Sequence, residues 1–378
     1  MIYKRRKYIR DEVTQTVGGT YKLDLPERGK LQMLWLRFYA PQVSGFGQGG
    51  GDWRLIDKIS KIEVIGNGST IIKSITGKVA QSIGWANDGI VAPDVWKNYA
   101  TAGHWCFIPI YFGRDSGDTE YFLDLADWDS VELQITNTAA AATFSSITGS
   151  VVATFLEPEA MVGTPLGYFR TEEWRNWTTV QNATEYLSLP TELQIRRIMM
   201  QVIPDLDANF MYETGMWNTA YRLYLGLKTG AVEMFNGPIS DLMRASGYDV
   251  GRETITTGAA YNTADKGFDM GIGYTYGAVP GAGSQDGAVA AGVPTIEAVQ
   301  TSATQKAEAY EADMLVQMIC KGVCYHNVLS VFQALGDLES NYIDPRVDDQ
   351  VLMNVQTRDS ASAADGTIRV ILERLVRR

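Results

Sequence analysis

The chain has 378 residues, of which 45% are hydrophobic and 20% charged, with a formal net charge of −11. This length suggests two or three domains with a full core, and the negative charge means that the surface as a whole should repel nucleic acid and anionic lipid. No apolar run reaches the ~18–20 residues of a membrane-spanning helix, and no hydrophobic stretch follows the N-terminus as in a secretory signal. We therefore expect a protein made and assembled in a cytosol.

Basic residues gather at the two ends of the chain. Residues 1–10 contain no acid and five basic residues, Lys4, Arg5, Arg6, Lys7 and Arg10, and the chain ends in "ERLVRR". Two interpretations stay open, namely solvated tails or segments that face an anionic surface, either lipid headgroups or packaged nucleic acid. The second interpretation makes the five N-terminal residues the candidate contact residues.

Strand signals dominate the chain in sequence order. Short segments rich in β-branched and aromatic residues, separated by Gly, Asn, Asp and Pro, predict strands at 31–41, 59–66, 69–75, 106–112, 130–136 and 150–156. Helices are predicted at 92–103, with Pro93 near the start, and at 302–322, which opens with a capping box at Ser302 and Gln305. Many strands with few helices indicate an all-β sandwich or barrel.

An internal repeat gives the domain organisation. "LDLPERGKLQMLWLRFYAP" from residue 23 resembles "LSLPTELQIRRIMMQVIP" from residue 187, and "IEVIGNGSTIIKSITG" from residue 62 resembles "LYLGLKTGAVEMFNG" from residue 223. "YFLDLADWDSVELQIT" from residue 121 overlies "NYIDPRVDDQVLMNVQ" from residue 341 without a gap, and 148–157 resembles 365–374. The order is the same in both halves, so we predict two β-domains of one fold.

The predicted boundaries follow from this repeat. We expect a basic arm at 1–20, a first domain at 21–160, a connector at 161–185 and a second domain at 186–378. The connector is rich in aromatic residues, so we expect it to pack against a domain. The second domain carries a Gly- and Ala-rich insertion at about 238–302, which is too poor in large apolar residues to form its own core and predicts an outward-facing loop.

Catalytic motifs are absent from the sequence. No serine has the glycine spacing of a nucleophile elbow, and no segment has the spacing of a phosphate-binding loop. The chain's histidines and cysteines fall in two places, His104 and Cys106 in one half and Cys320, Cys324 and His326 in the other. A closed zinc site needs about four ligands, which neither half supplies, so we expect buried strand residues. We predict no catalytic, cofactor or metal site.

Aspartates form the remaining cluster of interest. Asp124, Asp127 and Asp129 stand close together, but they lack the spacing of a calcium loop, and a glycosidase pair cannot be recognised from sequence. Asp124 and Asp129 recur as Asp344 and Asp349 ahead of the same strand. This recurrence favours a duplicated Asx turn, in which the carboxylate accepts backbone N–H groups.

The duplicated β-domain, the long insertion in one copy and the basic N-terminal segment together resemble the double jelly-roll major capsid proteins of tailless icosahedral viruses, the adenovirus and tectivirus lineage. The resemblance covers residues 21–378 and rests on architecture and the repeat. It implies two eight-stranded jelly rolls in an all-β chain, a pseudo-hexameric homotrimer and an icosahedral shell over an internal membrane. It further implies minor capsid and vertex proteins as partners, a virion location with assembly in the host cytoplasm, an outward tower at 238–302 and an inward N-terminal arm.

Two alternatives remain. One is a glycan-binding or glycan-processing double jelly roll, in which exposed aromatics such as Trp85, Trp96, Trp174 and Trp177 stack on sugar rings; packing of these aromatics in a core is the competing explanation. The other is a phage spike or appendage subunit, which shares the β-rich, acidic profile but not the two-copy organisation.

Overall fold

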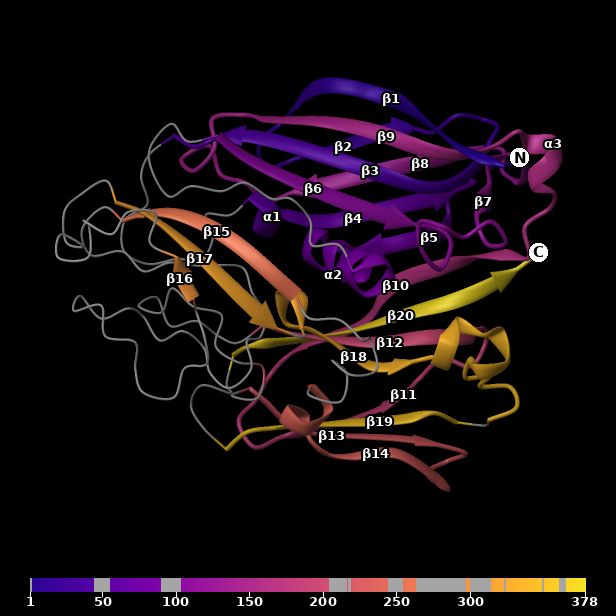
Figure 1. Ribbon diagram of the computed structural model, residues 1–378. Helices are drawn as coiled ribbons and strands as arrows, with labels where there is room; N and C mark the ends of the chain where they lie inside the picture. The colour runs from indigo at the N-terminus through magenta and orange to yellow at the C-terminus, as the bar shows by residue number, and fades with distance from the viewer. Residues whose placement is uncertain are drawn as a thin grey trace.

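The computed structural model describes residues 2–43, 55–89, 103–203, 216, 219–243, 254–262, 297–299, 314–322, 324–348, 350–359 and 365–378. Two β-sandwiches of the same topology stand side by side, and one sheet runs through both (Figure 1). Both chain termini lie at one end of the molecule, and a small sheet of three strands lies at the opposite end (Figure 1).

The first sandwich consists of two four-stranded layers. One layer has the order β1 (Tyr3–Gln15), β9 (Ile147–Glu157), β3 (Lys30–Pro41) and β6 (Gly103–Tyr111), with the short β7 (Leu123–Asp124) also paired to β3. The facing layer has the order β2 (Thr20–Asp24), β8 (Val131–Asn137), β4 (Ile59–Gly66) and β5 (Thr70–Ile75). Leaving β7 aside, eight strands in two Greek-key layers make a jelly roll.

The second sandwich repeats this arrangement strand for strand. Its first layer is β10 (Gly167–Thr178), β20 (Thr367–Arg377), β12 (Gln194–Ile203) and β18 (Val328–Gln333). Its second layer is β11 (Thr184–Ser188), β19 (Leu352–Thr357), β13 (Ala220–Leu227) and β14 (Val232–Pro238). The duplication inferred from the sequence repeat is therefore confirmed, as are the six predicted strands of the first half.

The cores follow from the alternation of side chains along the strands. In β3, Leu34, Leu36 and Phe38 are almost completely buried, while Trp35 and Arg37 between them are only half-buried. This period of two places one set of residues between the layers. Each sandwich encloses its own cluster of buried apolar residues, and Met199, Val328 and Ile371 of the second half pack against the first cluster.

Tight turns fix the register of the matching hairpins. Asn67 and Gly68, with φ of 50° and 71°, are the central residues of the turn between β4 and β5, in which the Ser69 N–H donates to the Gly66 carbonyl. Lys228, Thr229 and Gly230 hold the corresponding turn between β13 and β14, also at positive φ. In both hairpins the strand pairing shifts by one residue near the turn, at Val64/Ile65 and at Leu225/Gly226.

The longest α-helix among the described residues is α2 (Gly77–Asp88), which the sequence reasoning missed. Thr76 caps its first turn by accepting from the Val79 N–H, and Gly89 ends it in a left-handed conformation. The described residues also include short helical turns: α1 (Leu55–Lys58), α3 (Glu159–Val162), η1 (Leu125–Asp127), η4 (Tyr325–Asn327), η5 (Leu335–Asp337) and η6 (Glu339–Asn341). The predicted helix at 92–103 lies outside the described residues, except for Gly103, which begins β6.

Two predicted boundaries need correction. Residues 1–20 do not form a separate arm, because β1 pairs with β9 from Tyr3↔Glu157 to Gln15↔Ile147 and is the first strand of the first jelly roll. Residues 161–185 are not only a connector, because β10 pairs with β20 over its whole length and is the first strand of the second jelly roll. The sequences of β1 and β10 share little beyond their position in each half, so the internal repeat is not visible in them.

The predicted helix at 302–322 is wrong in its second half. Residues 314–322 form β17 (Met314–Gly322), which pairs with β15 (Thr254–Asn262) and β16 (Glu297–Val299). Backbone pairing with β15 over nine residues overrides the helical spacing of the sequence. The rest of that prediction and most of the predicted loop at 238–302 lie outside the described residues, although β14 ends at Pro238 and β15 falls within this range.

Candidate functional site

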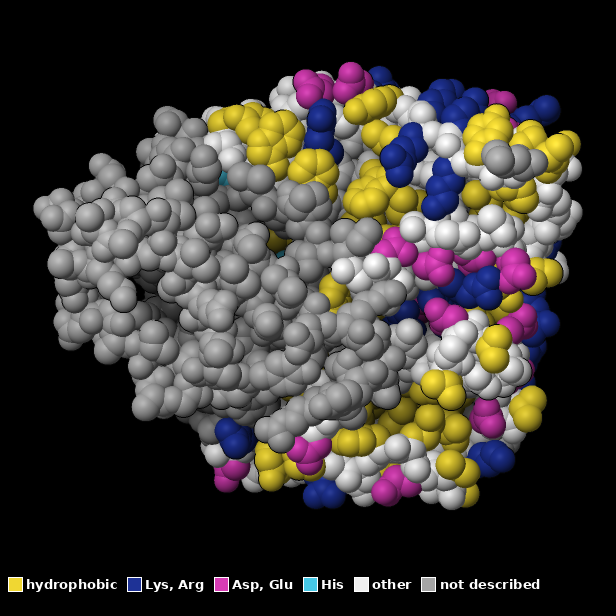
Figure 2. Space-filling model, in the orientation of Figure 1, with side chains coloured by type: hydrophobic (Ala, Val, Ile, Leu, Met, Phe, Trp, Pro, Cys, Tyr) yellow, Lys and Arg dark blue, Asp and Glu magenta, His cyan; other side chains and the backbone are white. Residues whose placement is uncertain are grey.

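The five predicted basic residues lie on β1 and are all exposed. The Lys4 ammonium donates to the Ser116 carbonyl, and Arg5 forms an ion pair of 3.0 Å with Glu157. For Arg6, Lys7 and Arg10, the described part of the chain supplies no ion pair. Figure 2 shows Lys and Arg side chains, in dark blue, on the side of the molecule where β1 lies. The strand thus carries a basic edge on a chain of net negative charge.

Among the edge strands of the described residues, β1 and β14 lie at the ends of two different sheets. Within the described residues, β1 pairs only with β9, and β14 pairs only with β13. The two strands lie at opposite sides of the molecule (Figure 1). Exposed large apolar side chains stand on both, Ile2, Tyr3 and Tyr8 on or beside β1 and Val232 and Met234 on β14. An unpaired edge of this kind is a template for pairing with another chain.

The junction between the two jelly rolls holds a buried ionic network. Arg196 on β12 is completely buried, and its guanidinium binds Asp337 through two hydrogen bonds of 2.8 and 2.7 Å. It also pairs with Glu373 on β20 and donates to the Arg114 carbonyl of the first half at 3.1 Å. Burial alone raises the pKa of Glu373 and Asp337, but the neighbouring arginines outweigh it and hold both pKa values below their ordinary range. Both acids are therefore ionised at neutral pH.

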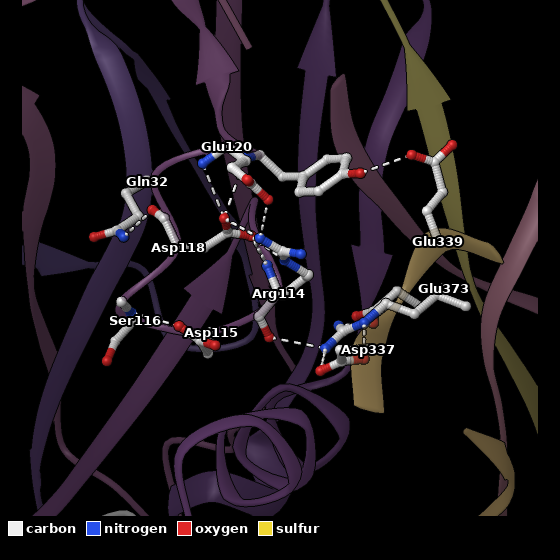
Figure 3. Close-up of polar contacts among 12 residues, drawn as sticks. Gln32, Arg114, Asp115, Ser116, Asp118, Glu120, Asp337, Glu339 and Glu373 are labelled. Carbon is white, nitrogen blue, oxygen red and sulfur yellow. Dashed lines mark hydrogen bonds and ion pairs between the residues drawn. The ribbon is translucent and has the colours of Figure 1, made fainter. Parts of the chain in front are cut away.

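The first half contributes a second cluster to this junction, centred on Arg114. Its guanidinium binds Asp118 at 2.9 and 3.0 Å and Glu120 at 2.5 Å. Close by, the Tyr121 hydroxyl donates to Glu339 of the second half at 2.9 Å. Burial and this bond to Glu339 raise the pKa of Tyr121 to about 12. Figure 3 shows Arg114, Asp118 and Glu120 facing Asp337, Glu339 and Glu373 across the junction.

Lys73 on β5 lies where the sheets of the two halves join. Its ammonium is buried, donates to the Thr171 hydroxyl at 2.7 Å, and stands 5.7 Å from the centre of the Phe112 ring. Burial lowers the pKa of Lys73 to about 7, with Glu373 opposing this shift and two arginines adding to it.

Arg197, beside Arg196 on β12, is also completely buried. Its Nη2 donates to Asn87 of α2 at 2.8 Å, whereas its Nε and Nη1 have no hydrogen-bond partner in the described part of the chain. Arg197 therefore ties the second jelly roll to the helix of the first. Together the contacts across the junction make the two halves one unit.

The predicted Asx turn exists at Asp124 in the first half and at Asp344 in the second. The Asp124 carboxylate accepts from the Ala126 N–H at 3.2 Å, and the Asp344 carboxylate accepts from the Arg346 N–H at 3.1 Å. Asp124 and Asp127 also pair with Arg378 at the end of the chain, a contact that the sequence did not suggest. The backbone of Asp129 is held by the Asn67 side chain, at 2.9 Å; its counterpart Asp349 lies outside the described residues.

Histidines and cysteines do not assemble a metal site in the described part of the chain, where no group of three or more His, Cys, Asp or Glu side chains has the required geometry. His104 is buried with its Nε2 3.0 Å from the Gln42 amide oxygen, and His326 is buried with its Nε2 2.6 Å from that of Gln81. Cys106 and Cys324 are buried thiols, and burial raises the pKa of Cys324.

The tryptophans proposed for sugar stacking do not form an exposed surface. Trp85 is buried in α2, and Trp174 and Trp177 pack against the core of the second jelly roll; Trp96 lies outside the described residues. The structure shows instead a half-buried pair on the first sheet, with Tyr39 and Trp105 rings 4.6 Å apart and Arg37 5.5 Å from the Trp105 ring. Tyr39 and Trp105 alternate along their strands with buried apolar residues, and this pattern could have identified them from the sequence.

Comparison with known proteins identifies the fold. No protein-family model and no curated protein matches the sequence. Among solved structures, the major capsid protein of Sulfolobus Turreted Icosahedral Virus matches with a TM-score of 0.57 and 9% identity, covering 100% of this chain and 97% of that one. The PBCV-1 virus capsid model matches with a TM-score of 0.59 and 8% identity, covering 99% and 94%.

The major capsid protein P2 from bacteriophage PM2 matches with a TM-score of 0.51 and 11% identity, covering 100% of this chain and 99% of that one. The matched structures are capsid proteins and not enzymes. The chain therefore has the double jelly-roll fold of these proteins, as predicted. No helix of the described residues is long and apolar enough to cross a membrane.

Proposed function

We propose that this chain is a viral major capsid protein, which forms a pseudo-hexameric homotrimer and then an icosahedral shell. The observation that carries this proposal is the full-length correspondence with capsid proteins, which includes both jelly rolls and almost the whole of each matched chain. Two jelly rolls of equal topology in one chain give a trimer six similar lobes, which suits hexagonal packing with neighbouring capsomers.

The buried junction supports a rigid building block. Arg196 binds both Asp337 and Glu373 within the second half, and its bond to the Arg114 carbonyl extends the network to the first half. Breaking such a pair leaves an uncompensated buried charge, so the two lobes hold a fixed angle. A shell needs this property, because every copy must meet its neighbours in the same geometry.

The positions of the chain ends support one orientation of the subunit in the shell. Both termini lie at one end and β15, β16 and β17 at the other (Figure 1). We propose that the end with the termini faces the particle interior and the other end faces outward. Lys4 and Arg6, exposed near the N-terminus, then meet an anionic surface, which is a membrane leaflet or the genome. Minor capsid and vertex proteins complete the virion, which assembles in the host cytoplasm.

The mass of the purified chain in solution tests this proposal. Size-exclusion chromatography with light scattering is expected to give about 125 kDa, three times the chain mass of 41.7 kDa. A single species of 41.7 kDa at every concentration, with binding to a glycan array, would favour the sugar-binding alternative instead.

A further inference from the structure

Inside one chain, the two jelly rolls are joined by a pair of parallel strands. The first strand of the second jelly roll, β10, lies beside β5 of the first, with Thr171 opposite Lys73 and Glu172 opposite Ser74. This contact makes one eight-stranded sheet out of two four-stranded layers. The Lys73 ammonium also binds the Thr171 hydroxyl there.

The duplication provides each of these two strands with a counterpart. β1 holds the place of β10, because β1 pairs with β9 as β10 pairs with β20. In both pairs the register shifts at one extra residue, directly after Tyr8 opposite Val152 in β1 and directly after Glu173 opposite Ile371 in β10. Tyr8 therefore corresponds to Glu173, Lys7 corresponds to Glu172, and Arg6 corresponds to Thr171.

β14 holds the place of β5 in the same way. Lys73 is opposite Val64 and Phe235 is opposite Leu225, while Ser74 is opposite Glu63 and Asn236 is opposite Tyr224. In each hairpin the strand pairing shifts directly after this residue pair, after Val64 in β4 and after Leu225 in β13, which confirms the alignment. Phe235 therefore corresponds to Lys73, and Asn236 corresponds to Ser74.

Each chain thus contains one formed junction of this type and the two halves of another. The halves, β1 and β14, have no second partner among the described strands and lie at opposite sides of the molecule. Opposite edges cannot meet within one chain, but they can meet between copies. A contact between two different edges is heterologous, so it generates a closed ring or a filament.

We propose that β1 of one copy pairs in parallel with β14 of a second copy, in the register of the internal junction. This proposal rests on the proposed function and names the surface through which the trimer forms. Arg6 then lies opposite Phe235 of the second copy, and Lys7 lies opposite Asn236. All six junctions of a trimer, three within chains and three between them, share one geometry.

Side-chain chemistry on the two edges fits this pairing. Tyr3 and Tyr8 are 55% and 58% exposed, and Val232 and Met234 are 43% and 40% exposed, so pairing removes apolar surface from water on both sides.

A disulfide between copies tests the register. Paired residues on adjacent strands have Cα atoms within the range that a disulfide bridges, so the double variant Lys7→Cys with Asn236→Cys, mildly oxidised, is expected to convert most chains into covalent dimers and trimers. The matched control is Lys22→Cys with Asn236→Cys, because Lys22 is exposed on the edge strand β2 of the other layer. The two single-cysteine variants show the background. Light scattering of every variant under reducing conditions gives its mass without the cross-link.

The outcomes distinguish a failure of the proposed interface from a failure of the proposed function. Trimers that form in all variants, with no cross-link above the control, overturn the β1–β14 contact and leave the capsid proposal standing. Chains that stay monomeric in the wild type overturn both.

Discussion

Asp124 and Asp344 stand 220 positions apart in the sequence and make the same turn, because each carboxylate accepts the backbone N–H of the residue two positions further on. In each half the turn leads into the strand that crosses the second layer of a jelly roll, β8 or β19. The acidic cluster around Asp124, which by itself suggests metal binding, therefore belongs to a turn that occurs once in each half. The acids turn the chain, and Asp124 and Asp127 additionally hold its C-terminal Arg378.

Removing the acceptor of this turn should cost stability without affecting any chemistry. Asp344→Ala is expected to lower the free energy of unfolding by about 1 kcal/mol, because one hydrogen bond to the Arg346 N–H is lost. Asp344→Asn keeps an acceptor oxygen and should cost clearly less. Urea unfolding of the two variants makes the comparison, and equal losses in both would show that the ion pair with Arg346 matters more than the turn.

Arg196 should be the most sensitive position at the junction. Arg196→Met leaves Asp337 and Glu373 buried without their main partner, which is expected to cost about 3–5 kcal/mol. Arg222→Met on the exposed face of β13 is the control and should change the free energy of unfolding by less than about 0.5 kcal/mol. Adding Asp337→Asn and Glu373→Gln to Arg196→Met should recover part of the loss. No recovery would mean that the shape of Arg196, not its charge, carries the effect.

Lys73 should make stability depend on pH in a defined window. Its pKa is about 7 in the folded chain against an ordinary value of 10.5, so between these values the unfolded chain holds a proton that the folded chain has released. Stability therefore rises with pH in this window, by up to about 1.4 kcal/mol per unit from this one group. Lys73→Met should remove that part of the slope, whereas exposed Lys61→Met should not.

The measurement is urea unfolding of wild type and both variants at pH 7.5, 8.0 and 8.5. This range avoids the opposing effect of Tyr121, whose pKa is raised to about 12, so that it stabilises the unfolded chain only above pH 10. Identical slopes in wild type and Lys73→Met would show that the ammonium keeps its proton when buried.

The basic residues of β1 should attract an anionic membrane despite the negative charge of the whole chain. Vesicles with about 30% anionic lipid are expected to bind the wild type more than Lys4→Ser with Arg6→Ser, at about 1 kcal/mol per basic residue removed. Lys22→Ser with Lys61→Ser, on exposed positions of other strands, is the control with the same charge change. Vesicle flotation at low and high salt measures this, and equal binding by both variants would place the contact elsewhere.

Sequence patterns predicted the strands and the duplication because both depend on local regularities. Alternation in β3 and the turn at Asn67 and Gly68 are visible in the printed chain, and the repeat of Asp124 as Asp344 needs only an alignment of the chain with itself. The first strand of each jelly roll could not be predicted from the repeat, because β1 and β10 are related by position and pairing and not by residue type. Alternation is also weak in β1, where almost every residue is exposed.

The junction could not be predicted for a different physical reason. Lys73, Arg196 and Glu373 are ordinary surface residue types, and only the pairing of β5, β10, β20 and β12 brings them into one buried place. Burial of paired charges has no local sequence signal. The helix α2 has caps at Thr76 and Gly89, but it begins with Gly77, a residue type that disfavours helix, almost directly after the strand β5.

The central claim is that this chain is a building block that assembles into threefold capsomers with six jelly-roll lobes. Electron cryo-microscopy of the purified protein tests it most directly. We predict class averages with threefold symmetry and a six-lobed outline, in which β1 of each copy lies against β14 of the next. Particles that contain a single copy with two lobes at all concentrations would contradict the account.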